Sequence, residues 1–416
     1  MKVSFFETGH YRPPRPLPRE WPVPPAAYDH EAGAQSYRGM VERLRFVEEL
    51  GFDWVSVAEH HYSPHRLTPA PIVSAAHLAA CAKTIKIAVL GPIVSQSNPV
   101  QVAEELAMLD VLSQGRLVVG LLRGITGEYL SYGLNPTEAR ERTTEAMELI
   151  LKAWTEPQPF GWQGRHFRFR TVSVWPRPLQ QPHPQTYALG GSRESCEFAA
   201  RHHLGLGVAY GPFDGVAKAT RYYRDACAGF GWQPAPEQII YRANILLAAS
   251  DEEAQDLMKA HRASVDSFPL RPAIRDGLLQ LDSRNVAGES RPAMLGGVLP
   301  VNFIGGPDTI VKQIKQCRDQ VGAGVIDLMF QTPASSDPVD ALMHRLELFG
   351  EKILSRIRDE WAYFLNPALA DRSAETSIGV VAGRQSSLRP PNCGGWNLLP
   401  LRAFAMTGRR PRGAII

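Results

Sequence analysis

Two adjacent histidines, His60 and His61, end the β-rich segment Val55-Ser-Val-Ala-Glu-His-His61. Successive side chains of a strand face opposite sides. We therefore expect Val55 and Val57 to face outward, and the intervening set to face inward: Trp54, Ser56, Ala58 and His60. An imidazole ionises near neutral pH and can move a proton to or from a reacting group. His60 is thus a candidate catalytic residue, the alternative being a polar pair satisfied by backbone hydrogen bonds.

A second candidate closes the apolar run Gly115-Arg-Leu-Val-Val-Gly-Leu-Leu-Arg-Gly124. The planar guanidinium of Arg123 presents two parallel N–H donors, which suit a phosphate group. Gly124 directly follows it. The alternative is a salt-bridged arginine at the end of a strand.

A third candidate is Leu189-Gly-Gly-Ser-Arg-Glu-Ser-Cys196, a strand followed by two glycines and a helical pattern. Ser192 is a good N-cap residue, and the free amides behind it favour an anion. Glycine at position 191 lets an anionic group approach the backbone closely. A plain strand-to-helix turn is the alternative. The three segments together favour chemistry, because a barrel brings such strand ends to one rim.

The sequence lacks the motifs of several other classes of enzyme. The sequence has no G-x-S-x-G, H-E-x-x-H or Walker lysine motif. The five cysteines lie far apart without C-x-x-C spacing, so no metal site is predicted. Unpaired, scattered cysteines are typical of a reducing compartment, and we expect a cytoplasmic protein.

Short β-rich runs alternate with helical patterns along the chain, which predicts a parallel sheet. The predicted strands are Val3–Glu7, Asp53–Ala58, Ile85–Gly91, Leu117–Leu122, Gln185–Leu189, Leu206–Tyr210, Arg242–Ala248 and Gly324–Phe330. The clearest helices are Gln35–Leu50, Pro99–Leu112, Glu138–Trp154, Arg193–His202, Val216–Ala228, Asp308–Gln320 and Pro338–Arg358. No G-x-G-x-x-G follows an early strand, which disfavours an open dinucleotide-binding sheet. The predicted fold is α/β, a single parallel (βα)8 TIM barrel.

Insertions are expected after strands 1, 4 and 7. The first, Gly9 to His30, carries seven prolines and would border the barrel entrance. The second is a short β-excursion at Phe160 to Val174, and the third is His261 to Val301. The predicted division is a barrel domain over residues 1–360 and an irregular, poorly packed extension over 361–416.

Charge and hydropathy limit the partners. The formal net charge is +3, and the last 46 residues carry seven arginines against two acids, so the remainder is close to neutral. This pattern lacks the clustered basic face of a nucleic-acid binder. The N-terminus turns polar after six residues, and no apolar run is long enough to span a membrane, so neither a signal peptide nor a membrane partner is expected.

These segments resemble the luciferase-like flavin-dependent monooxygenase family, in particular its bacterial luciferase branch. The resemblance runs from Lys2 to about Arg358. Its motifs are Ala58-Glu-His-His-Tyr62, Asn98-Pro-Val through Leu109-Asp-Val-Leu-Ser-Gln-Gly-Arg116, Arg123-Gly124, Gly190-Gly-Ser-Arg-Glu-Ser, Gly305-Gly-Pro-Asp-Thr-Ile and Ala323-Gly-Val-Ile-Asp-Leu.

The resemblance implies a two-component monooxygenase that uses reduced FMN, supplied by a separate flavin reductase, and O2. Oxygen would add at flavin C4a, and the resulting (hydro)peroxyflavin would oxygenate a small organic substrate. By matching position, His60 would handle protons. The resemblance assigns the phosphate to Arg123, Gly124, Gly191, Ser192 and Ser195, and the flavin ring to the backbone at Ala58, Leu90 and Gly91. The Leu90–Gly91 link corresponds to a non-proline cis peptide in luciferase. The resemblance also implies a homodimer or a heterodimer with a related chain.

Two departures separate this chain from luciferase. Leu122 stands where luciferase has a reactive cysteine, and the proline-rich loop after the first strand is longer. We therefore do not predict light emission. We expect an apolar lumen from Leu90, Val119, Leu121 and Leu122, which would exclude water. The alternatives are a deazaflavin-dependent oxidoreductase that transfers hydride, and a non-catalytic flavin-binding protein.

Overall fold

Eight parallel strands close into a barrel in the computed structural model, which describes residues 1–18, 23–62, 66–265, 301–331 and 340–358. Each strand pairs with its neighbours in chain order, and the ring closes because the last strand pairs with the first. The strands of the ring are β1 (Lys2–Phe6), β2 (Trp54–Val57), β3 (Lys86–Ile93), β4 (Leu117–Leu122), β7 (Gln185–Leu189), β8 (Gly205–Ala209), β9 (Ile239–Leu247) and β11 (Val325–Phe330). The predicted TIM barrel is confirmed.

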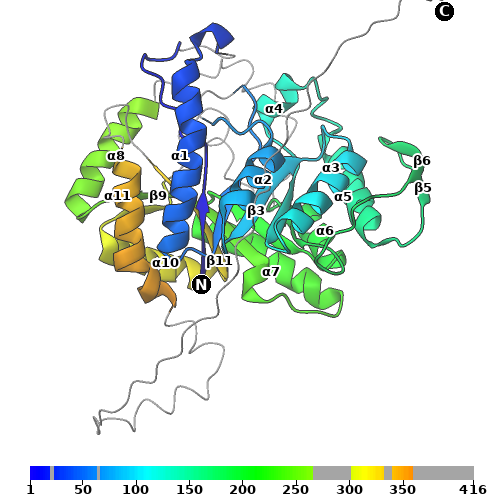
Figure 1. The fold of residues 1–416 in the computed structure, drawn as a ribbon. Coiled ribbons are helices and arrows are strands. Elements are labelled where there is room, and N and C mark those ends of the chain that lie inside the picture. Colours follow the sequence, from blue (N-terminus) through cyan, green and yellow to red (C-terminus); the bar gives the residue numbers. More distant parts are fainter. Residues whose placement is uncertain (19–22, 63–65, 266–300, 332–339, 359–416) are drawn as a thin grey trace, which may run out of the picture. The chain divides into compact units, whose positions relative to one another are not determined.

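Helices cover the outside of this ring (Figure 1). They are α1 (His30–Glu49), α2 (Pro71–Cys81), α3 (Pro99–Leu112), α5 (Ala139–Thr155), α6 (Arg193–Arg201), α7 (Phe213–Gly229), α8 (Asp251–Val265), α10 (Pro307–Val321) and α11 (Ala341–Phe349), the last continuing into a π-helical turn at Gly350–Leu354. In α1 the buried residues recur at helical spacing, among them Met40, Leu44 and Val47. Asp29 caps this helix by accepting from the Ala32 amide at 2.8 Å, so α1 begins five residues before the predicted start. No helix of the described residues is long and apolar enough to cross a membrane.

Four elements were missing from the predicted set: α2, α4 (Thr126–Ser131), α8 and β10. Helix α2 was missed because its residues are mostly small and apolar, which leaves no contrast between two faces. Helix α8 follows β9, and strand β10 (Phe303–Gly305) pairs with the edge of β9 outside the ring. A three-residue strand gives too little pattern to detect.

The insertions follow the predicted places as far as they are described. Residues 9–30 connect β1 to α1, with 19–22 outside the described residues. The β-excursion is an antiparallel hairpin of β5 (Phe160–Gln163) and β6 (Arg168–Val172). The predicted insertion after strand 7 and the predicted extension over 361–416 fall largely or wholly outside the described residues, as does the predicted start of the last helix at Pro338.

A plug of large side chains fills the lower lumen. Trp54 and Tyr187 meet there at a ring distance of 6.3 Å, together with Ala88, Leu90, Val118, Ile240 and Val325. Val55 and Val57 instead pack in the layer between strands and helices, so the predicted inward and outward faces of β2 are correct. The prediction for β4 was wrong at Val119, which belongs to the helix-facing layer while Val118 faces the lumen, whereas Leu121 and Leu122 do line the cavity described below. The error is one residue of register, which reverses the faces of a strand.

Candidate active site

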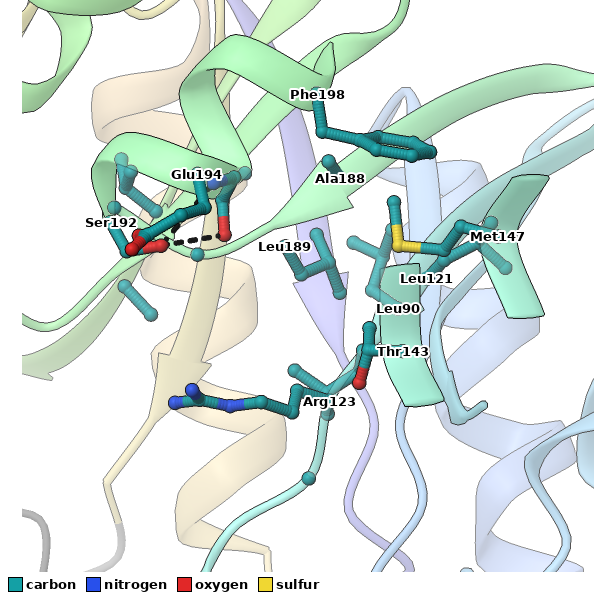
Figure 2. Close-up of a pocket in the computed structure, with 18 of the residues that line it drawn as sticks. Leu90, Leu121, Arg123, Thr143, Met147, Ala188, Leu189, Ser192, Glu194 and Phe198 are labelled. Atoms are coloured by element: carbon teal, nitrogen blue, oxygen red, sulfur yellow. Dashed lines mark hydrogen bonds between the residues drawn. The ribbon is translucent and has the colours of Figure 1, made fainter. Parts of the chain in front are cut away.

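A cavity of about 260 Å³ opens at the carboxyl ends of β4, β7 and β8. Figure 2 shows polar Ser192 and Glu194 grouped on one side and apolar Leu90, Leu121 and Met147 on the other. Parallel barrels keep their reacting groups at this end, because every strand points its carboxyl end toward the same rim. The cavity therefore lies where a barrel enzyme binds its ligands.

The turn between β7 and α6 supplies hydroxyl and amide groups to the cavity. Ser192 caps α6, accepting from the Ser195 amide at 3.2 Å, and the two hydroxyls lie 3.1 Å apart. Arg140 donates to Ser192 Oγ at 3.3 Å and to Glu194 at 3.0 Å. Gly190 has φ +149, and an added Cβ would lie 3.0 Å from Ser195 Oγ, so this turn requires glycine. The resulting helix N-terminus suits an anion.

Arg123 and Gly124 line the same cavity from the end of β4. The backbone here is held by side chains from two sides: Ser95 donates to the Arg123 carbonyl at 2.6 Å, and Tyr129 donates to the Gly124 carbonyl at 3.0 Å. Gly124 has φ +96, and a Cβ would lie 2.8 Å from Ile93. The strand end is thus fixed by its neighbours, which positions the Arg123 side chain at the rim.

The peptide bond between Leu90 and Gly91 is cis, as in the family that the sequence resembles. Leu90 lines the cavity. A Cβ on Gly91 would lie 1.8 Å from the Gly120 carbonyl oxygen, so the strands approach too closely here for a side chain. Ala58 is buried beside Phe6, Tyr210 and Met329 at the top of the lumen.

His60 lies between a cation and a carboxyl group. Arg66 donates from Nη1 to His60 Nε2 at 2.8 Å, and His60 Nδ1 lies 3.2 Å from Glu128 Oε1. Because a guanidinium only donates, Nε2 must accept and Nδ1 must carry the proton toward Glu128. This assignment of the tautomer follows from the hydrogen-bond partners. Burial, and then the positive charge of Arg66, hold the pKa of His60 well below its usual range. The imidazole is therefore neutral at physiological pH.

Glu128, on the short helix α4 (Thr126–Ser131), has an unusual carboxyl group. Burial raises its pKa to about 7. Its Oε2 is fully shielded and has no hydrogen-bond partner within the described parts of the chain. A carboxyl group that titrates near neutrality can take up or release a proton at physiological pH. Glu128 was not singled out from the sequence, because a helix of six residues shows too little pattern to detect.

The neighbouring histidine has a different role. His61 Nε2 lies 2.7 Å from Glu59 Oε1, and both side chains are nearly buried. Glu59 also accepts from the Ile93 amide at 2.9 Å and from Gln96 at 3.0 Å. These bonds tie the end of β2 to the end of β3, so the pair stabilises the rim.

A charged layer crosses the lumen above the apolar plug. Asp327 of β11 is fully buried and accepts from Arg242 Nε and from Ser56 Oγ, both at 2.6 Å. The Arg242 guanidinium stacks over the Phe6 ring at 3.9 Å from its centroid. Arg242 and Asp327 also line the cavity. Neither was singled out from the sequence, although a charge inside a strand of apolar residues is a readable signal.

The sequence-predicted residues thus gather at one end of the barrel, in two groups. The cavity is lined by Leu90, Arg123, Gly124, Gly191, Ser192 and Ser195. Ala58, His60 and Gly91 are not among its lining residues. His60 connects to the β4 side of the rim through Glu128, which follows Gly124 by four residues.

The family model described as luciferase-like monooxygenase matches residues 22–323. The oxygenase component of a flavin-dependent trigonelline monooxygenase from Acinetobacter baylyi is 27% identical over 55% of this chain and 64% of its own length. The alkanal monooxygenase beta chain of Photorhabdus laumondii is 25% identical over 75% of this chain and 90% of its own. The chain spans less than two thirds of the length of several curated relatives that it matches, at 59% and 64% for two of them.

Solved structures show the same barrel. The monooxygenase RslO1 from Streptomyces bottropensis superposes with a TM-score of 0.67 at 25% identity, covering 85% of this chain and 99% of its own. The oxygenating constituent of 3,6-diketocamphane monooxygenase from Pseudomonas putida, in complex with FMN, superposes with a TM-score of 0.64 at 18% identity, covering 86% and 99%.

Proposed function

This chain belongs to the luciferase-like monooxygenase family, and from that premise we propose that it is the oxygenase component of a two-component system using reduced FMN and O2. The observation that carries the proposal is the cavity, which joins an anion-compatible helix N-terminus and a rim arginine to an apolar interior. The flavin-dependent relative and the FMN-bound neighbour support the choice of cofactor.

The residues present fit such a cofactor. Ser192, Ser195 and Arg123, with the backbone at Gly124 and Gly191, would hold the phosphate at the β4 and β7 side. The close backbone approach at Gly91, beside Leu90, leaves a side-chain-free surface against which a flat ring would lie, with Ala58 at the top of β2. Reduced FMN supplies the electrons that activate O2 for transfer of one oxygen atom to a small organic substrate.

The remaining chemistry falls to side chains of this chain. His60 donates a hydrogen bond from Nδ1 to Glu128 across 3.2 Å, and the carboxyl group of Glu128, whose pKa is about 7, can take up or release a proton beside it. The Nε2 atom is held as an acceptor by Arg66. Leu90, Leu121 and Met147 keep water from the cavity interior, which protects a reactive oxygen species from unproductive decay.

Cofactor titrations test this assignment. The full chain is titrated anaerobically with FMN, reduced FMN and a deazaflavin, and the Arg123→Gln variant is compared with Arg165→Gln, whose arginine lies exposed on the β5–β6 hairpin. We expect reduced FMN to bind best, and Arg123→Gln alone to weaken it by ~10- to 100-fold, the range for a hydrogen bond to a charged group. Tighter binding of the deazaflavin would contradict the FMN assignment and favour hydride transfer.

Turnover separates an oxygenase from a flavin carrier. A chain that only binds flavin would consume O2 no faster with a flavin reductase and NADH than the reductase does by itself, and would oxygenate none of a panel of organic substrates. We expect reductase-dependent oxygenation, because the Acinetobacter baylyi relative is named as the oxygenase component of a flavin-dependent monooxygenase. Product formation from NADH and FMN without any reductase would contradict the two-component scheme.

The apolar outer face of α2 and α3 supports the proposed dimer. Val73, Met108, Val111 and Leu112 are all more than two-fifths exposed on these helices, which pack against each other. Exposed apolar side chains on two neighbouring helices favour an association surface. We expect a dimer by light scattering, and a monomer after Val111→Glu; a monomeric native chain would contradict the proposal.

A further inference from the structure

The rim opposite the phosphate-compatible end carries a second cationic group, centred on Arg66. In the closed ring, β4 and β7 lie four places from β11 and β1. Arg66 reaches the β11 side, where its Nη2 lies 3.8 Å from the sulfur of Met329. Met329 packs with Phe6 of β1 and Ala58 after β2. A phosphate bound at the β4 and β7 side would therefore lie at a different part of the rim from Arg66.

Arg66 has acceptors but no anion. Its hydrogen bonds go to the imidazole nitrogen of His60 and to the Met329 thioether, both neutral. Within the described residues no carboxylate forms a salt bridge with it. Sulfur is a weak acceptor, and a partly buried cation such as Arg66 without a paired anion is costly. The N–H donors of the Arg66 guanidinium are thus matched to neutral acceptors and not to a negatively charged group.

A second arginine adds positive charge at the same place. Arg242 stacks on Phe6, which belongs to the same cluster as Met329, and it lines the cavity. Asp327 binds its Nε, but its Nη2 is shielded and has no hydrogen-bond partner among the described residues. Asp327 carries a single negative charge and also accepts from Ser56. It therefore cannot neutralise both arginines.

The other titratable groups around Arg66 do not neutralise the positive charge of the two arginines. Glu128 accepts from His60 through Oε1 and becomes fully charged only above neutral pH, because burial raises its pKa to about 7. Glu7 is paired with Arg43 at 2.6 Å. His10 is shielded, and burial lowers its pKa to about 4, so it is neutral. Tyr210 is buried, and burial raises its pKa, so it too is neutral.

We propose that this second cationic rim, formed by Arg66 and Arg242, receives the negatively charged group of the substrate, which is therefore an organic acid bearing a carboxylate or similar oxyanion. Arg66 is the direct ligand, and Arg242 contributes charge from the cavity wall. The inference rests on the proposed function and narrows its substrate class. A charge-assisted pair here would hold the apolar body of the acid above the lumen, next to His60.

Matched acids and amides test the proposal on the full chain, with and without bound FMN. Benzoate, phenylacetate and octanoate are titrated by calorimetry against benzamide, phenylacetamide and octanamide. We expect at least one acid to bind ~10- to 100-fold more tightly than its amide, as a charge-assisted hydrogen bond provides. Arg66→Gln should remove this preference while the affinity for FMN stays within about twofold. The control Arg38→Gln changes an exposed arginine on α1 and should alter neither.

The outcomes separate this inference from the proposed function. Equal affinity for acids and amides, no acid binding at millimolar concentration, or an acid preference that survives Arg66→Gln would each overturn the inference while FMN binding stands. Loss of FMN affinity in Arg66→Gln, equal to its loss of acid affinity, would assign Arg66 to the reduced flavin instead and also overturn it. Failure of FMN to bind the native chain would overturn the proposed function, while the acid preference is still measured in the FMN-free arm.

Discussion

Replacing Asp327 by asparagine should cost the barrel a large part of its stability. The carboxylate has no solvent exposure and accepts two hydrogen bonds of 2.6 Å, one from the buried guanidinium of Arg242. Asparagine has the same shape but no charge, so the guanidinium would remain shielded without its anion. Breaking a buried ion pair from one side costs about 3–5 kcal/mol. We expect the free energy of unfolding of Asp327→Asn to fall by that amount.

Urea denaturation followed by circular dichroism measures the loss, with Asp256→Asn as the matched control. Asp256 pairs with Lys259 at 2.7 Å on α8, but both side chains are more than 70% exposed, so this substitution should cost about 0.5 kcal/mol or less. A double variant, Arg242→Met with Asp327→Leu, should recover most of the loss, because no charge is left buried. A loss below about 1 kcal/mol in Asp327→Asn, or a double variant worse than the single one, would refute the reasoning.

Three further changes have defined outcomes. Gly91→Ala should lower the thermal midpoint through the clash of its Cβ with a backbone carbonyl 1.8 Å away, by the equivalent of about 1–3 kcal/mol, whereas Gly229→Ala, with open space around it, should not; equal midpoints would contradict the crowding. Because the pKa of the Glu128 carboxyl is raised from 4.5 to about 7, its contribution to stability is fully present below pH 4.5 and is lost as pH rises through 7. Urea midpoints of the native chain should therefore drop between pH 5 and pH 7.5 more than those of Glu128→Gln, and parallel profiles would count against this pKa. Ser192→Ala removes the cap of α6 and should cost about 1 kcal/mol of stability and weaken FMN binding; unchanged FMN affinity would exclude Ser192 from the phosphate site.

The strands of the barrel were predictable because each is a short β-branched or apolar run whose two neighbours in sequence are also its neighbours in space. Predicted strands such as Leu117–Leu122 and Gln185–Leu189 agree with the structure at both ends. It was harder to predict which residues of each strand face the lumen. In β4 every residue is apolar or glycine, so alternation gives no phase, and Val119 was placed on the wrong side.

The phosphate-compatible turn was also readable, because glycines followed by a capping serine have a local physical meaning. The partners of His60 were not. Arg66 lies in a loop and Glu128 lies in a helix of six residues. Each contacts the His60 imidazole only because of how these segments fold in space, which the local sequence does not indicate. Arg242 and Asp327 were partly predictable. Each is a charged residue within an apolar strand, which indicates a buried ion pair, but the sequence does not identify the partner of either residue.

The aromatic plug at the base of the lumen decides how ligands come and go. Trp54 and Tyr187 obstruct the barrel from within, and the Tyr187 hydroxyl is fixed below by a 2.6 Å bond to the Glu237 carbonyl. These side chains therefore close the base of the lumen, and the cavity opens at the carboxyl ends of the strands. Under the proposed function, flavin and substrate would therefore enter and leave through the same opening at the carboxyl ends of the strands.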